Sequence, residues 1–187
     1  IDSTDSILIQ EFYGDTTISS VNSIKISDGT VLSRKFMEMK SNSQNDYIIS
    51  DLLGGSVNGT NKNEYLIGQS HADTLNGGDG NDELLSGDGA DILNGGSGDD
   101  LLVGGHGADS YIFSAGWGHD VIDEIQSSYA FKENENRMKD DKLIDTIKFD
   151  NTINFADLSY KKQDANLVIT NNKTGDSIQV INYFSEN

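Results

Sequence analysis

Residues 77–112 read GGDGNDELL, SGDGADILN, GGSGDDLLV and GGHGADSYI, which are four consecutive units of nine residues. Each unit begins with glycine-rich residues, has an Asp at its sixth position and carries an apolar or aromatic residue at its eighth. So regular a period indicates an ordered repeat rather than a disordered Gly- and Asp-rich linker. The frame extends back to residue 41, and the eighth position is apolar in all eight units: Ile48, Val57, Leu66, Leu75, Leu84, Leu93, Leu102 and Tyr111.

Each unit predicts a turn followed by a short strand. Alternate side chains of a strand point to opposite faces, so three residues around one inward apolar side chain make a minimal strand. The six residues before them form the turn, where glycine permits positive φ angles and close backbone approach. Two units complete one coil, so equivalent turns recur every 18 residues. After a slip at Phe113 and Ser114 the pattern returns once, which places Asp73, Asp91 and Asp109 on one edge and Asp82, Asp100 and Asp120 on the other.

Composition shows why such a coil needs help to fold. The 187 residues include 31 acids against 13 Lys and Arg, a net charge of -18, and only 35% hydrophobic residues. The apolar surface that folding can bury is therefore small for a chain of this length. The absence of Cys excludes disulfides and thiolate metal sites. So acidic a chain is repelled by nucleic acid and by anionic membranes. Because no Lys or Arg lies between Lys62 and Lys132, the repeats repel themselves unless cations bind.

The expected cation is Ca²⁺. Stacked turns bring carbonyl oxygens and one carboxylate each around common points, and Ca²⁺ takes about six to eight such oxygen ligands. No EF-hand loop is present, and His71, His106 and His119 are interpreted as solvated turn residues rather than zinc ligands. The sequence also contains no H-E-x-x-H, G-x-S-x-G or P-loop motif, which predicts that this chain is not an enzyme.

The units GGDGNDELL and GGSGDDLLV resemble the repeat-in-toxin (RTX) nonapeptide GGxGxDxUx, most specifically over residues 68–123. The resemblance implies a right-handed parallel β-roll, an all-β fold that binds several Ca²⁺ ions. Ser86 departs from the motif at its first Gly, Gln69 and His71 at other glycines, and Glu64 is one methylene longer than Asp. Carried over residue by residue, the motif assigns carboxylate ligands to Asp73, Asp82, Asp91, Asp100, Asp109 and Asp120, and turn carbonyls to Gly78, Gly80, Gly87, Gly89, Gly96, Gly98, Gly105 and Gly107.

We divide the chain into an upstream flank and lead-in over 1–40, the β-roll over 41–123 and a C-terminal capping flank over 124–187. DSILIQEFY at 5–13 matches DSIQVINYF at 176–184, which predicts a tandem arrangement of blocks in the parent protein. Strands at 158–162, 166–170 and 177–183 should form an antiparallel cap. The Asp-Gly pair within 25–32 should form a turn, and Ser33 should cap a short helix that runs through Lys40. The outward residues of one sheet are largely apolar, and we expect the C-terminal flank to cover them: Tyr65, Ile67, Glu83, Leu85, Leu101 and Val103.

The resemblance implies a secreted or cell-surface location, export by a type I secretion system, and folding outside the cell when Ca²⁺ binds. Our leading hypothesis is a calcium-binding scaffold module of a secreted toxin or exoprotein. Two alternatives remain open. One is a Ca²⁺-stiffened spacer block of a surface adhesin, with neighbouring blocks of the same chain as partners. The other is the C-terminal module of a secreted protease or lipase.

Overall fold

The computed structural model describes residues 23–25, 31–33, 46–49, 54–123 and 144–184. The chain divides into two compact units, residues 1–43 and 44–187. In the first unit, β1 (Ser23–Lys25) pairs antiparallel with β2 (Val31–Ser33), and Ile24 lies opposite Leu32. This pairing agrees with the predicted reversal of the chain, while the turn itself and the helix expected over 34–40 lie outside the described residues.

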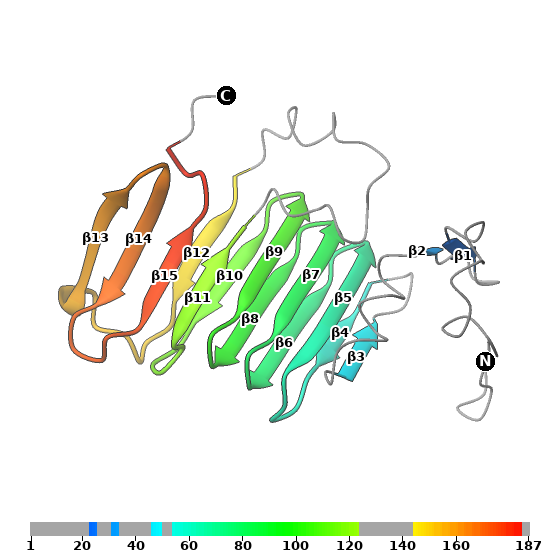
Figure 1. Cartoon of the computed structure of the whole chain (residues 1–187), viewed down its shortest axis with the longest axis horizontal. Coiled ribbons are helices and arrows are strands. Elements are labelled where there is room, and N and C mark those ends of the chain that lie inside the picture. The colour runs from blue at the N-terminus through cyan, green and yellow to red at the C-terminus, as the bar shows by residue number, and fades with distance from the viewer. Residues whose placement is uncertain (1–22, 26–30, 34–45, 50–53, 124–143, 185–187) are drawn as a thin grey trace, which may run out of the picture. The chain divides into compact units, whose positions relative to one another are not determined.

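The second unit is a parallel β-roll whose consecutive strands alternate between two sheets (Figure 1). Equivalent strands are offset by 18 residues, as in the pairing of Leu66 with Leu84, and the offset grows to 20 where Val121 pairs with Leu101. The predicted all-β fold, its parallel coil and the slip are confirmed. The five-stranded sheet contains β12 (Thr146–Phe149), β10 (Ser110–Phe113), β8 (Ile92–Ser97), β6 (Thr74–Asp79) and β4 (Ser56–Asn58). The eight-stranded sheet contains β13 (Leu158–Gln163), β14 (Asn166–Asn171), β15 (Ser177–Val180), β11 (His119–Ile122), β9 (Leu101–His106), β7 (Glu83–Asp88), β5 (Glu64–Ser70) and β3 (Asp46–Ile49).

A single row of apolar side chains from each sheet fills the space between them. These are the eighth-position residues of the repeat, and each Leu of the row is 0% exposed. The core is thus one side chain wide per strand, which agrees with the low apolar content of the sequence. The buried row comprises Val57, Leu66, Leu75, Leu84, Leu93, Leu102 and Tyr111.

The C-terminal flank closes one end of the roll. β12 adds to β10 and β15 adds to β11, both in parallel, whereas β14 and β13 follow antiparallel as the sequence predicts. Phe113, Trp117 and Phe149 pack with ring centroids 5.7–5.9 Å apart at this end. A 3₁₀ turn, Phe155–Asp157, is capped by the side chain of Asn154. The flank therefore continues both sheets and closes the core with aromatic rings.

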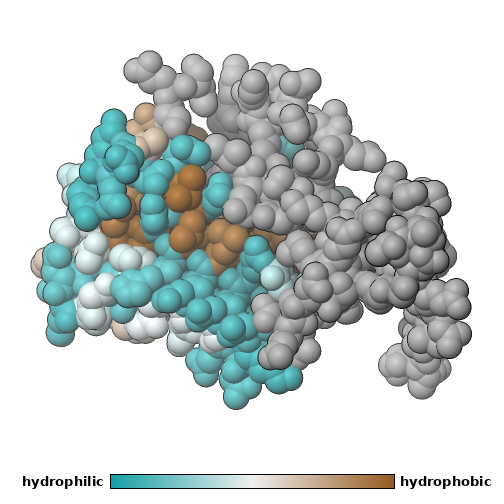
Figure 2. Space-filling model, viewed as in Figure 1, coloured by the Kyte–Doolittle hydropathy of each residue, from teal (hydrophilic) through white to brown (hydrophobic). Residues whose placement is uncertain are grey.

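The outer faces of the two sheets differ. Asn76 donates to Asn58 along the five-stranded sheet, in a polar row exposed to solvent. On the eight-stranded sheet the outward residues Ile67, Leu85 and Val103 are buried. Apolar side chains gather on one side of this unit, bordered by hydrophilic ones (Figure 2). Described flank strands lie at the sheet ends, and residues 124–143 lie outside the described residues, so coverage of this face by the flank stays a prediction.

Candidate metal centre

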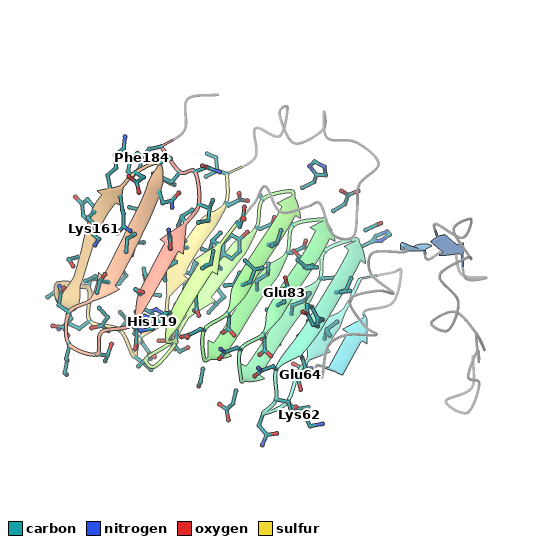
Figure 3. The ribbon with its side chains drawn as sticks, in the orientation of Figure 1. Lys62, Glu64, Glu83, His119, Lys161 and Phe184 are labelled. Carbon is teal, nitrogen blue, oxygen red and sulfur yellow. The ribbon has the colours of Figure 1, made fainter. Side chains whose placement is uncertain are left out.

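The turns of the roll lie along two rims. We call the turns that lead from the five-stranded to the eight-stranded sheet the first rim, and those that lead back the second rim. In the repeats from residue 59 onward, the sixth-position acid stands where its turn enters the next strand, and each of these acids is at most 3% exposed. Glu64 and His119 mark two coils of the first rim (Figure 3). The buried acids are Glu64, Asp82, Asp100 and Asp120 on the first rim and Asp73, Asp91 and Asp109 on the second, so the predicted aspartates fall into the two expected rows.

One oxygen of each aspartate ties its coil to the coil before it. Oδ1 of Asp91 accepts the backbone N–H of Asp73, 18 residues earlier, at 2.8 Å. Oδ1 of Asp120 accepts that of Asp100, 20 residues earlier, at 2.9 Å. These bonds fix each carboxylate and use one of its two oxygens. The same bond joins Asp73 to Gly55, Asp82 to Glu64, Asp100 to Asp82 and Asp109 to Asp91.

The other oxygen is left without a partner in four of these carboxylates. Oδ2 of Asp82, Asp91, Asp100 and Asp120 is buried and accepts no hydrogen bond from any residue that the structure describes. Burying an ionised carboxylate oxygen unpaired is strongly unfavourable, and a bound cation would remove that penalty. The protein alone therefore leaves part of the buried charge uncompensated.

The pKa values of these buried carboxyl groups reflect the same lack of compensating charge. Burial raises the pKa of Asp82 to about 6, that of Asp100 to about 7 and that of Asp120 to about 8, although backbone N–H donors partly offset it. The pKa of Asp91 is raised by burial as well. Neighbouring carboxylates raise all four further, because a second negative charge nearby disfavours ionisation.

Glycine makes room for the carboxylates and for the stacked turns. A Cβ added at Gly77 would collide with the carboxylate of Asp82, and one at Gly96 with the carbonyl oxygen of Gly78 in the coil before it. The turns therefore stack with their backbones in contact, which brings carbonyl groups to the rims. The eight predicted glycines all have positive φ: Gly78, Gly80, Gly87, Gly89, Gly96, Gly98, Gly105 and Gly107.

This donor set fits Ca²⁺. In the part of the chain that the structure describes, no three His, Cys, Asp or Glu side chains converge as a metal-ligand group. An ion held at a rim would need backbone carbonyls beside the single carboxylate of each turn, and all-oxygen sites of this kind suit Ca²⁺ rather than Zn²⁺. Nδ1 of His119, the exposed first residue of β11, instead lies 3.0 Å from the hydroxyl oxygen of Ser177 at the start of β15. The assignment of individual Asp and Gly ligands stays a prediction.

Two departures from the repeat have local explanations. The longer side chain of Glu64 bends back to its own turn, where it accepts from the backbone and the hydroxyl of Thr60. Ser86, which replaces a glycine, donates its hydroxyl to the carbonyl oxygen of Gly104 at 2.7 Å. Glu64 thus lacks the free buried oxygen of the aspartates, and Ser86 joins two coils of the second rim.

Sequence reasoning missed how the two rows of acids end. Oδ1 of Asp145 accepts the N–H of Asp109 at 2.9 Å, which extends the second rim by one coil. Its signal was the likeness of DTIKF at 145–149 to DSYIF at 109–113. On the first rim Asp120 pairs with Ile178, a buried apolar residue, so the acidic row stops there.

Comparison with known families identifies the repeated segment. The family described as RTX calcium-binding nonapeptide repeat (4 copies) matches residues 58–93 and, again, residues 85–122. Together these matches span the strands from β5 to β11. No curated protein matches the chain.

Proposed function

Because residues 58–122 are RTX calcium-binding nonapeptide repeats, we propose that this chain is a calcium-dependent folding module of an exported bacterial protein. RTX repeats bind Ca²⁺ and are typical of exported bacterial proteins. The observation that carries the proposal is the row of buried Oδ2 atoms without partners at Asp82, Asp91, Asp100 and Asp120. Among the described residues there is no helix long and apolar enough to cross a membrane.

Calcium binding and folding are coupled in this proposal. The unfolded chain has no preformed site, so the free energy of binding contributes directly to folding. Extracellular Ca²⁺ modules bind at roughly 10⁻⁴ to 10⁻³ M, far above cytosolic Ca²⁺. The repeats accordingly stay unfolded in the cytosol, pass through a type I secretion system and fold outside, where the Asp carboxylates and turn carbonyls hold several ions.

The module acts as a non-enzymatic scaffold of a secreted toxin or exoprotein. A second candidate is a spacer block of a surface adhesin, which the likeness of residues 5–13 to residues 176–184 favours because it points to repeated blocks. In that role Ca²⁺ would stiffen a chain of such rolls. Long repeats upstream in the parent would favour the spacer, whereas a catalytic motif there would favour a protease or lipase.

A Ca²⁺ titration followed by far-UV circular dichroism tests the proposal, with Mg²⁺ as the control ion. We expect β-structure to appear on addition of Ca²⁺ and not of Mg²⁺. Asp82→Asn should raise the Ca²⁺ concentration at half-folding several-fold. Asp79→Asn, which changes an exposed acid at the end of β6, should leave that concentration nearly unchanged. Identical spectra in chelator and in Ca²⁺ would contradict the proposal.

A further inference from the structure

At the end formed by the C-terminal flank, the inner face of the eight-stranded sheet carries side chains that become progressively more exposed. Ile178, Ile169 and Tyr160 are direct cross-strand partners on β15, β14 and β13, so they share one face. Along this row the side chains pass from 0% exposed at Ile178, through half-buried at Ile169, to 83% exposed at Tyr160. The face that is core at β15 is therefore open to solvent two strands further on.

Other apolar groups lie at the same end of the roll. Phe155 contacts Phe149 of the aromatic cluster, with centroids 5.8 Å apart, yet is 67% exposed. Lys162 lies in the neighbouring row of β13, opposite Leu167, and its Nζ lies 4.9 Å from the ring centroid of Phe184. Lys161 and Phe184 both stand at this end of the second unit in Figure 3. Exposed apolar residues that continue a core mark a surface that another element covers.

The sequence indicates which element that is. In the match between residues 5–13 and 176–184, the core-facing positions Ile178 and Val180 correspond to Ile7 and Ile9. Residues 5–13 thus have the sequence of a β15 strand, and the β1–β2 pair comes after them along the chain. In a tandem protein this pair would come directly after the flank sheet of the preceding copy.

The β1–β2 pair is a two-stranded sheet that no other described strand extends. Among the described residues, β1 and β2 pair only with each other. A two-stranded hairpin alone is marginally stable at best in water, and further strands or packing on another element stabilise it. Residues 10–22 connect a β15-like strand to β1, and these 13 residues reach at most about 45 Å. Since β13 lies two strands, or about 10 Å, from β15, the connection is long enough.

We propose that the β1–β2 hairpin of one copy packs on the exposed inner face of β13 and β14 of the copy before it. The element that packs on this face thus comes from a second copy of the same sequence unit, and Tyr160 lies at the centre of the contact. Successive rolls are then joined by a shared core rather than by a free linker. This inference goes beyond calcium-dependent folding and requires a parent protein with tandem copies of this unit.

The test extends the chain in register. Residues 14–33 are joined after Phe184, as residue 14 follows residue 13, and the extended and unextended chains are compared in the same Ca²⁺ buffer. We expect the thermal midpoint to rise by about 3 °C or more. Backbone amides of β13 should exchange at least tenfold more slowly. Because both chains are compared under one condition, a chain that folds without Ca²⁺ would defeat the function proposed above and leave this comparison valid.

Two matched substitutions locate the contact. Tyr160→Ser should abolish the rise in thermal midpoint that the added residues 14–33 give. Lys161→Ser, on the opposite face of the same strand, should preserve that rise. Measuring each substitution in both chains cancels its effect on strand propensity. An unchanged midpoint with unchanged exchange in β13 would overturn the inference. A gain that survives Tyr160→Ser would overturn it too, because the hairpin would then pack elsewhere.

Discussion

The two rims of the roll share a row of buried acids but differ at the residue just before each acid. On the first rim these fifth-position side chains form a second row of hydrogen bonds. Asn63 accepts the N–H of Asn81, Asn81 that of Asp99, and Asp99 that of His119, at 2.9–3.1 Å. On the second rim the same position is Ala in three turns: Ala72, Ala90 and Ala108.

The two rows on the first rim run in opposite directions. A fifth-position oxygen accepts from the following coil, whereas a sixth-position carboxylate accepts from the preceding one. Each pair of coils is thus joined twice on the first rim, and the fifth-position bonds need no ion. The alanines of the second rim cannot accept such bonds, so its turns depend more on their carboxylates and on any cation these bind. One repeat motif therefore supports two degrees of dependence on Ca²⁺.

Acidification without Ca²⁺ should have the largest effect, because several buried carboxyls respond together. The pKa values of Asp82, Asp100 and Asp120 are raised to about 6, 7 and 8 from 3.8. A raised pKa in the folded state favours folding below the unfolded value, and this contribution is lost as the pH rises through the folded value. In chelator we therefore expect more β-structure at pH 5 than at pH 8 by circular dichroism.

With Ca²⁺ present the dependence should reverse, since protons and Ca²⁺ compete for the same carboxylates. The Ca²⁺ concentration at half-folding should then increase as the pH falls from 8 to 5. A metal-free spectrum that is the same at both pH values would show that these carboxyls do not oppose folding.

Removing one carboxylate from each rim should produce the next largest effect. Asp91→Ala leaves the N–H of Asp73 without its acceptor, and Asp100→Ala does the same to Asp82. Each loss costs about 1–3 kcal/mol in addition to the lost ion contact. We expect Asp91→Ala to lower the free energy of unfolding by about 1 kcal/mol more than Asp100→Ala does, because the second rim has no fifth-position hydrogen bonds to hold its coils together. The Ca²⁺ midpoint for folding measures this difference, and equal shifts for the two variants would contradict it.

Sequence reasoning reached the repeating features and the strands of the flank, but it missed two details that occur only once. The apolar eighth position predicts the sheets, and the 18-residue spacing of the acids predicts the rims. Both patterns could be recognised because they recur in many units. Asp145 lies 36 residues from Asp109, and a single rung of five residues gives too little periodicity to be recognised. Glu64 shows another limit, since its longer side chain bends back to Thr60, a choice that only the turn geometry decides.

Removing the Asp145 carboxylate, which adds a rung to the second rim, should have a smaller effect on stability, and Asp145→Asn serves as its control. Asp145→Ala removes the acceptor for the N–H of Asp109 and should cost about 1 kcal/mol, loosening β12 from β10. Asp145→Asn retains a side-chain oxygen and should restore most of that loss. Thermal unfolding in Ca²⁺, with exchange of the Asp109 amide, measures both. If Asn behaves like Ala, the charge of Asp145 matters rather than its hydrogen bond.

The smallest effects should come from exchanging the fifth-position residues between the rims. Asn81→Ala removes the acceptor for the N–H of Asp99, an exposed bond worth about 0.5–1 kcal/mol. Ala90→Asn should supply the equivalent acceptor to the second rim and stabilise it by a similar amount. A sharper measurement compares the Ca²⁺ midpoints for folding of Asp91→Ala and Asp100→Ala. The difference between these two midpoints should become smaller when either Asn81→Ala or Ala90→Asn is also present. If that difference stays the same in both backgrounds, the fifth-position row is not what separates the rims, and the unequal charge around their carboxylates must do so instead.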